Sequence, residues 1–511
     1  MNNSENQKVI EDINNINNLI TKGKYQEALN IFRILECSSS PNNKNIKINK
    51  LACLVNIGEG LKNTIIIQEG INAGEKCLED SQNKEYEATI HYNLANGYSA
   101  LYKLKREYLQ KSKYHYREAI KTSVNLDSNS KKWLFVNYGN CLDSLGRVVE
   151  ALYAYDKALK IDPNFSMAIG NKAIAMKFFA DISGKYRGAI YIEAYQAITS
   201  IINKQDIISC GSPIAKQAFE NELKEIESHF KSKEDLTKKI YHEDYNISNL
   251  SDFEKFFLNF CIKEKLFLNF HIQEDNCEAA VADPIFITII TDVKDDNTFY
   301  ELAKHINQIK EDYIVSRLLL IQSQYRSKDF DNISQRTTFV NTPDNSKFNL
   351  YNGLLKTAFK QAYNILDKIA TCINSYYNLG LDENHIYFTS IWQKKDRDEI
   401  RDEILKTQNT SLHALYDIYL DIKSGYFKKI QDIRNAATHN KLVIYDSIST
   451  NCNEKGNIDY DTMVSETINL MQLAKSAIIY LINFINIEEN KKRKRIKVEV
   501  AQIYVDTSQS L

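Results

Sequence analysis

The chain has 511 residues, enough for more than one domain at roughly 100 to 200 residues each, and its 43% hydrophobic and 26% charged content excludes fibrous, collagen-like and disordered classes. With only 5 Pro and 16 Gly, it lacks the turn-forming residues of a β-sandwich or barrel, so we expect a mostly α-helical protein. The formal net charge of −1 gives no overall electrostatic drive toward nucleic acid or an anionic membrane, and any basic surface must be local.

The cysteines and the N-terminal residues bear on cofactors and location. The 9 cysteines are scattered singly, without a CxxC pair or a metal-ligand spacing to histidine, so we expect reduced thiols, no metal and no cofactor. The start, MNNSENQKVIEDINN, lacks the apolar segment of a signal peptide, and no stretch approaches roughly 18 uninterrupted apolar residues. We therefore expect a cytoplasmic protein without a membrane partner.

Residues 132 to 165 carry a spacing that a helix-turn-helix repeat requires. The matching positions are Phe135, Tyr138, Gly139, Leu142, Ala151, Tyr155, Ala158 and Pro163. Small residues let two antiparallel helices cross closely, and the proline stops the second helix. The pattern resembles the tetratricopeptide repeat, with aromatic residues replacing the Trp and Leu at its start.

Further copies of this pattern are predicted through residues 1 to 205. One runs from Leu94 to Ile120 with extra residues between its halves, and a fragment at 23 to 32 follows a helix predicted at 9 to 21. Residues 46 to 80 and 166 to 202 are predicted to be more degenerate helix pairs, so we expect four to six repeats. Stacked repeats form a curved solenoid that binds a peptide or protein ligand. The alternative is that the helices only brace the rest of the chain.

Residues 206 to 345 are predicted to form a helical connecting region. A charged helix is expected over 203 to 240, another over 299 to 323, and polar turns over 326 to 349. The segment FEKFFLNFCIKEKLFLNF at 253 to 270 is amphipathic and rich in aromatic residues. We interpret it as a core helix, in preference to a base-stacking platform.

Residues 346 to 511 are predicted to be a helical bundle. One helix starts near 350, another spans roughly 411 to 430, and the stretch 461 to 487 is apolar enough to be the central helix. Between the last two, the segment QDIRNAATHNKLVI at 431 to 444 contains Arg434, Asn435 and His439. This arrangement resembles the Arg-x4-6-His motif of the HEPN superfamily, helical-bundle domains many of which are metal-independent endoribonucleases. Together with the repeats, it resembles one prokaryotic subgroup of that superfamily.

The resemblance implies roles that agree with the chemistry of these residues. An imidazole, with an ordinary pKa of about 6.5, can accept and donate protons near neutral pH, so His439 is the candidate acid and base. Arg434 would bind phosphate and stabilise the charge of the phosphorane that forms when a 2′-OH attacks. Asn435 would orient the substrate or His439. The implied products are a 2′,3′-cyclic phosphate and a 5′-OH, without metal or cofactor.

The helix geometry limits what one copy of the motif can do. Residues five apart lie roughly 140° apart around a regular helix, so Arg434 and His439 would not share a face. In HEPN ribonucleases two domains pair around one cleft, so the resemblance implies a homodimer with a composite site. The structural alternative is that Arg434 pairs with Asp432 or Glu403, that His439 is a helix-end residue, and that the bundle is a scaffold.

The strongest basic run follows the bundle. It consists of Lys491, Lys492, Arg493, Lys494 and Arg495. A solvated helix end is the preferred interpretation; contact with the RNA backbone is the sharper alternative, and a nuclear signal the third. Residues 496 to 506 alternate partly at period two, which predicts a short strand.

These patterns favour an all-α protein, a repeat solenoid followed by a HEPN-type ribonuclease that acts as a dimer on RNA, either tRNA or mRNA. Similar architectures occur in prokaryotic toxin and antiviral defence systems, in which the solenoid would hold the nuclease quiet until a trigger binds. Two alternatives stay open. One is a non-catalytic adaptor, and the other is a peptide-responsive regulator built on the repeats.

Overall fold

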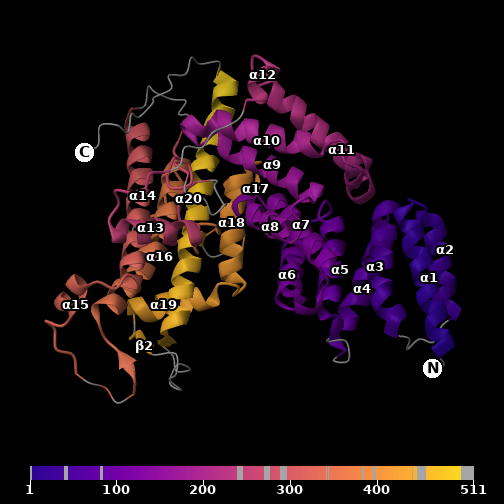
Figure 1. The fold of residues 1–511 in the computed structure, drawn as a ribbon, viewed down its shortest axis with the longest axis horizontal. Helices are drawn as coiled ribbons and strands as arrows, with labels where there is room; N and C mark the ends of the chain where they lie inside the picture. The colour runs from indigo at the N-terminus through magenta and orange to yellow at the C-terminus, as the bar shows by residue number, and fades with distance from the viewer. Residues whose placement is uncertain are drawn as a thin grey trace. The chain divides into compact units, whose positions relative to one another are not determined.

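The computed structural model is dominated by α-helices, as the composition predicted (Figure 1). Packing divides the chain into two units, one built from residues 1–175 and 201–219 and the other from residues 176–200 and 220–511. The structure describes residues 3–38, 44–80, 85–238, 245–269, 277–287, 296–340, 342, 344–382, 385–394, 399–439, 441–445 and 456–496. The domain boundaries predicted at residues 205 and 345 stay predictions.

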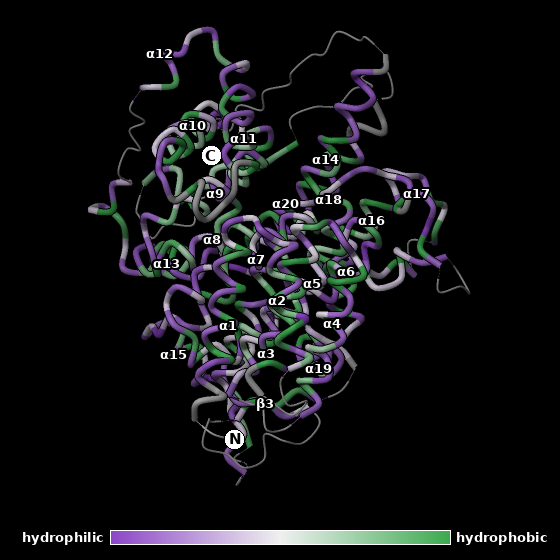
Figure 2. Tube along the Cα trace, turned by 90° about the vertical axis from the view of Figure 1, so that its right-hand side faces the viewer, coloured by the Kyte–Doolittle hydropathy of each residue, from purple (hydrophilic) through white to green (hydrophobic). Residues whose placement is uncertain are grey.

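The first unit is a stack of helix pairs. In chain order these are α1 (Asn3–Thr21), α2 (Tyr25–Ser38), α3 (Lys44–Gly60), α4 (Thr64–Glu79), α5 (Glu87–Leu101), α6 (Glu107–Lys121), α7 (Ser128–Ser144) and α8 (Val148–Ile161). Each odd-numbered helix packs on the next, and α4 packs on α5 and α6 on α7, so each pair stacks on its neighbour. Hydrophobic and hydrophilic residues alternate along these helices (Figure 2). This is the helix-pair solenoid that the repeat spacing predicted.

The α7/α8 pair shows why the repeat needs small residues at fixed positions. A Cβ on Gly139 would overlap the ring of Tyr155, and Ala151 and Ala158 are completely buried. The Tyr155 hydroxyl donates to Asn140 Oδ1 at 2.9 Å, so the ring that fills the crossing is also fixed at its polar end. α8 ends at Ile161, two residues before the proline predicted to stop it.

Three helices after α8 contribute residues to both units. They are α9 (Ser166–Ala180), α10 (Arg187–Ile201), of which only Ile201 belongs to the first unit, and α11 (Gln205–Glu227). The short α12 (Lys233–Leu236) follows them. Within the first unit, the ring of Phe219 occupies the space that a Cβ on Gly170 would need. The connecting helix predicted over 203 to 240 corresponds to α11, which ends at Glu227.

The second unit is a helical bundle whose axis is α20. Its long helices are α14 (Asp296–Gln324), α16 (Leu350–Tyr377), α18 (Thr410–Lys423) and α20 (Tyr460–Ile496). α20 packs on the other three, and α14 packs on α16 (Figure 1). By length and composition α20 passes as a candidate membrane span, but 83% of its most apolar window is buried inside the fold. It is therefore the central helix that the sequence predicted, extended from 487 to Ile496.

A small sheet holds the starts of the bundle helices together. β1 (Ser346–Lys347) pairs antiparallel with β2 (Val443–Tyr445), and β2 pairs parallel with β3 (Asn457–Asp459). α16 begins shortly after β1, and α20 begins directly after β3. Except for Ile496, the last residue of α20, the strand predicted at 496 to 506 lies outside the described residues.

The aromatic segment forms a shorter helix than predicted. α13 (Asp252–Lys263) ends where Lys265 adopts a left-handed conformation with φ 57°. Side chains of the bundle take up the carbonyls that follow, because Tyr313 Oη donates to Leu266 O at 2.8 Å and Lys475 Nζ donates to Lys265 O at 3.1 Å. With these carbonyls occupied by side chains, the helix does not continue to 270.

The helix predicted over 411 to 430 is two helices. α18 ends at Lys423, Gly425 takes φ 83°, and α19 (Lys428–His439) starts a new direction. A glycine reaches this left-handed conformation without steric cost, and that permits the turn. The shorter helices α15 (Lys328–Ser334) and α17 (Asp402–Leu405) connect the longer ones.

Candidate functional site

Helix α19 carries the predicted motif, and its burial pattern sets how the motif is presented. Ile430, Ile433 and Ala437 are spaced at helical intervals and buried, so this face packs into the bundle, chiefly against α16. Asn435 is exposed, and Arg434 is half-buried at the edge between the two faces. The motif thus lies where α19 meets α16 and solvent.

The guanidinium of Arg434 is held by an aromatic ring and an amide. Its Cζ lies 5.3 Å from the centroid of the Tyr363 ring on α16, and its Nη1 donates to Asn435 Oδ1 at 3.3 Å. Its contacts among the described residues are thus with Tyr363 and Asn435, and no ion pair joins it to Asp432 or Glu403 there. Most N–H donors of the guanidinium therefore stay available to an incoming anion.

The charge of Arg434 affects the pKa values of two side chains on α16, Tyr363 and Asp367. Burial raises the pKa of Tyr363, Asp367 raises it further, and Arg434 opposes them. Burial also raises the pKa of Asp367, while the backbone N–H of Phe388, which donates to its Oδ1 at 2.8 Å, and Arg434 lower it. Asp367 is committed to Phe388, so it does not neutralise the guanidinium by a direct contact.

His439 is the last residue of α19. Its side chain lies outside the described residues, so its convergence with Arg434 stays a prediction. The helix is unbroken between the two, which places their backbones roughly 140° apart around the axis. The direction of the histidine side chain relative to the guanidinium stays a prediction.

Helix α16 contributes a lysine beside the end of α19. Lys356 Nζ donates to Leu442 O at 2.7 Å, three residues beyond the last residue of α19. Lys356, Lys360, Tyr363 and Asp367 follow each other at intervals of four, three and four residues, which is one face of a helix. Tyr363 and Lys356 could not be linked to the motif from the sequence, because they lie more than seventy residues before it. The signal that the sequence did carry was their helical spacing with Lys360 and Asp367 among apolar residues.

Comparison with known families agrees with the bundle and with the motif's position in it. Residues 293–488 match the family model described as LA2681-like HEPN, and residues 134–165 match a tetratricopeptide repeat model. The chain carries a HEPN domain. The motif on α19 lies inside the matched range of this domain, and α7 and α8 lie across the matched repeat.

The comparison with solved structures adds little to this assignment. The TPR2AB domain of yeast Sti1, solved in a complex with pHSP90, is 12% identical, and the alignment covers 43% of this chain and 99% of that one. The TM-score is 0.18, which carries no argument, so the solenoid rests on its own helix pairs and repeat motif. Among curated proteins, none matches this chain.

The basic run lies at the C-terminal end of α20, just beyond the residues that match the HEPN family model. Lys491 pairs with Glu488 at 2.8 Å, and Lys492 pairs with Glu489 at 2.6 Å and lies 4.7 Å from the centroid of the Tyr376 ring. The side chains of Arg493 and Lys494 are exposed, and that of Arg495 lies outside the described residues.

The basic run is separated from the motif along α16. The ring next to Lys492 belongs to Tyr376, and the ring next to Arg434 belongs to Tyr363, thirteen residues earlier on the same helix. At 1.5 Å per residue these two contacts are about 20 Å apart. Contact of the run with RNA stays a prediction, and it would involve a different part of the strand from that at Arg434.

Metal binding has no candidate in the part of the chain that the structure describes. There, no three His, Cys, Asp or Glu side chains group closely enough to hold an ion.

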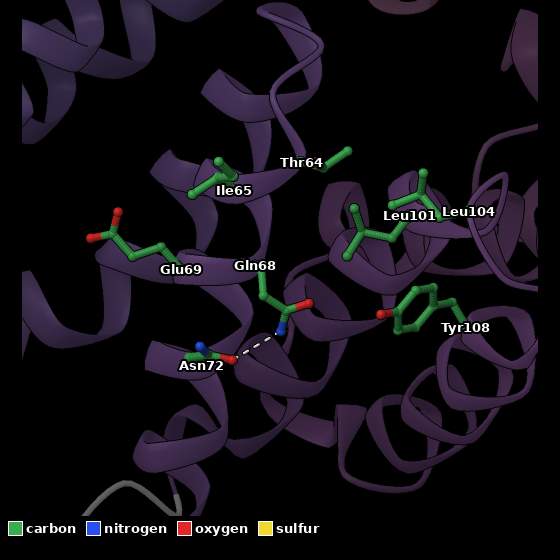
Figure 3. A pocket seen from close by; sticks show the side chains of 8 residues that line it. All are labelled: Thr64, Ile65, Gln68, Glu69, Asn72, Leu101, Leu104 and Tyr108. Carbon is green, nitrogen blue, oxygen red and sulfur yellow. Dashed lines mark hydrogen bonds between the residues drawn. The ribbon is translucent and has the colours of Figure 1, made fainter.

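The solenoid carries a hollow of about 500 Å³ between α4 and the turn from α5 to α6 (Figure 3). Thr64, Ile65, Gln68, Glu69 and Asn72 line it from α4, and Leu101, Leu104 and Tyr108 line the other side. Gln68 Nε2 donates to Asn72 Oδ1 at 2.9 Å along its floor. Apolar and amide groups therefore face each other across this hollow.

Proposed function

We propose that this chain is a metal-independent endoribonuclease in which the HEPN domain cuts RNA and the repeat solenoid binds a protein or peptide that controls it. The observation that carries the proposal is Arg434 on α19, half-buried in the HEPN domain and without an ion pair to any residue that the structure describes. A buried or half-buried guanidinium is normally paired with a carboxylate. One held by a ring and an amide, next to solvent, is suited to an incoming phosphate.

Arg434 would act on the phosphate that is cut. Its planar donors match two phosphate oxygens at once, and the negative charge on these oxygens grows when the phosphorane forms. The Tyr363 ring would limit the directions that the guanidinium can take, so less freedom is lost when phosphate binds. Asn435, exposed and already bonded to Arg434, would orient the substrate or the histidine.

The reaction needs one proton acceptor and one proton donor. A neutral imidazole of His439 takes the proton of the ribose 2′-OH while the 2′-oxygen bonds to phosphorus. The bond from phosphorus to the 5′-oxygen then breaks, and a protonated imidazole gives that oxygen a proton. The products are a 2′,3′-cyclic phosphate and a 5′-OH, so no water, oxidant or metal enters the atom balance.

A homodimer would supply both imidazoles. Because the backbones of Arg434 and His439 lie roughly 140° apart around α19, two HEPN domains that face each other would bring the arginine of one copy toward the histidine of the other. One histidine then acts as base and its counterpart as acid. Cleavage activity is accordingly expected to fall on dilution below the dissociation constant of the dimer.

The solenoid would regulate this activity. Stacked tetratricopeptide repeats bind protein segments, and a ligand that binds one state of the chain more tightly shifts it toward that state. We place the protein in the cytoplasm, in a toxin or antiviral defence role, with tRNA or mRNA as the target.

The test is cleavage of total RNA and of a tRNA pool by the purified full-length chain in excess EDTA. Wild type is compared with Arg434→Ala and His439→Ala, and the new RNA ends are mapped. Cleavage that persists in EDTA, leaves cyclic phosphate and disappears in both variants supports the proposal. If a dimeric, folded wild type is as inert as both variants, with and without a solenoid ligand, the chain is a binding adaptor instead.

A further inference from the structure

The face of α16 that meets α19 carries two lysines next to the motif. Lys356, Lys360, Tyr363 and Asp367 lie on one face of the helix, and the contacts of two of them locate that face. Tyr363 lies under Arg434, and Lys356 reaches the carbonyl that follows the end of α19. These four residues form a stripe on α16 that runs along α19 and continues past the C-terminal end of α19.

Lys360 lies between these two contacts. It is three residues before Tyr363 and four after Lys356, so it is opposite the stretch of chain between Arg434 and Leu442. That stretch contains the last turn of α19. The rise along α16 from Tyr363 to Lys360 is about 4.5 Å, within the reach of a flexible four-carbon side chain.

The electrostatics of this face favour an anion. Lys360 is exposed, Lys356 is half-buried, and neither forms an ion pair with a carboxylate among the described residues. Burial lowers the pKa of Lys356, and the positive charge of Lys360 lowers it further. Asp367, at the far end of the stripe, is bonded to Phe388 N and lies beyond Tyr363 from the two lysines. Two ammonium groups that repel each other would both be stabilised by a shared negative ligand.

We propose that Lys360, with Lys356 behind it, forms a second phosphate subsite that holds the RNA phosphate next to the one at Arg434. The proposal rests on the proposed function and deepens it, because it fixes the path of the strand along α16 beside α19. Lys356 keeps the exit of α19 in place through Leu442, and Lys360 is the residue that meets the phosphate.

The direct test is RNA binding by the full-length chain in a His439→Ala background, which would leave the probe uncut. The probe is a short single-stranded RNA oligonucleotide of mixed sequence, titrated at salt concentrations between about 50 and 200 mM. Lys360→Ala is expected to weaken binding several-fold and to reduce the slope of log affinity against log salt by about 0.7, the value for one phosphate contact on a single strand. Lys360→Arg is expected to keep the slope.

The matched control is Lys231→Ala. Lys231 is an exposed lysine between α11 and α12, so its substitution removes the same charge without touching α16. Affinity and slope of this variant are expected to equal those of the background. If Lys360→Ala behaves like Lys231→Ala, the subsite is wrong.

Cleavage by otherwise wild-type protein separates failure of the subsite from failure of the nuclease. Lys360→Ala is expected to raise KM several-fold with little change in kcat, because it touches a phosphate that does not react. If wild type cleaves and Arg434→Ala does not, while Lys360→Ala keeps the wild-type KM, only the subsite fails. If wild type never cleaves but Lys360→Ala loses binding and salt slope, the nuclease fails and the anion site stands.

Discussion

In the solenoid, the rings of His91 and His115 meet inside the α5/α6 pair with their Nδ1 atoms 2.9 Å apart. The HEPN domain instead buries two basic side chains, Arg317 and Lys475, against backbone carbonyls. The histidine pair satisfies itself by sharing one hydrogen bond between neutral rings. These two side chains are held by carbonyls at the end of α13, and Arg317 also pairs with Asp283 at 2.7 Å. The α5/α6 pair thus buries two neutral polar rings against each other, whereas the end of α13 is held by buried basic side chains.

This difference separates the two regions in their response to pH. Burial, then the neighbouring His91 and Lys111, lowers the pKa of His115 to about 4 from an ordinary value of 6.5. Burial lowers the pKa of Lys475 to about 7 from 10.5, with Asp283 opposing. Between the lowered pKa and the ordinary pKa of each group, the unfolded chain binds more protons than the folded chain, so stability rises with pH there. The solenoid loses stability as the pH falls from about 6.5 to 4, and the bundle gains stability as it rises from about 7 to 10.5.

The largest expected effect is in the HEPN domain. Arg317→Ala removes the buried partner of this ion pair and leaves the partly buried Asp283 with the Leu268 N–H but without its cation, which costs up to about 3–5 kcal/mol. Hydrogen exchange of amides in α14 and α20 is expected to become faster, with those of α5 and α6 unchanged. The control is Arg317→Met combined with Asp283→Asn, which removes both charges and should lose much less. Equal losses in the two variants would show that the charge pair is not what holds α13.

The next effect concerns the histidine pair. In wild type, the free energy of unfolding in urea, followed through the α5 and α6 amides, is expected to fall by up to about 3 kcal/mol between pH 6.5 and pH 4. Glu87 and Glu118 face His91 and weaken its own shift, so most of this change belongs to His115. His115→Gln should flatten the pH dependence by about one proton. Substitution of the exposed His385 by Gln should leave the slope unchanged; an unchanged slope for His115→Gln would contradict the assignment.

A glycine comparison tests close packing in the two regions. Gly139→Ala in α7 forces a methyl group into the Tyr155 ring and is expected to destabilise the solenoid by about 1–3 kcal/mol. Gly353→Ala in α16 meets no atom within 4 Å and is expected to stabilise the bundle by about 0.4–1 kcal/mol. Chemical denaturation measures both. Similar changes of the same sign would contradict the role of Gly139 at the crossing.

The smallest effect is expected at Tyr363, a positioning residue for Arg434. Tyr363→Leu removes the aromatic face, and at about 0.5–2 kcal/mol for such a contact kcat of RNA cleavage should fall about two- to thirty-fold. Tyr363→Phe keeps the face and is expected to restore most of the rate, with KM little changed in either variant. If Phe and Leu lower the rate equally, the ring does not position the guanidinium.

Local signals account for what could be predicted along the chain. The solenoid pairs follow from small residues, aromatics and a terminating proline at repeat spacing, as at Gly139, Tyr155 and Pro163, because each pair packs within a few tens of residues. The apolar stretch of α20 predicted the bundle axis, since a helix that is hydrophobic on most sides is buried. The sequence pattern placed Arg434 and Asn435 between two predicted helices, whereas the structure places them on α19.

Other features depended on contacts between distant segments. The break at Gly425 went unpredicted because a single glycine inside a helical pattern is tolerated and does not by itself mark a helix end. The end of α13 depends on Tyr313 and Lys475, which lie far along the chain. The same holds for the site: periodicity identifies which face of α16 is polar, but not which helix covers it. Local sequence specifies helices and their faces through short-range sterics and apolar spacing, whereas the pairing of Tyr363 with Arg434 and of Lys356 with Leu442 arises from long-range packing.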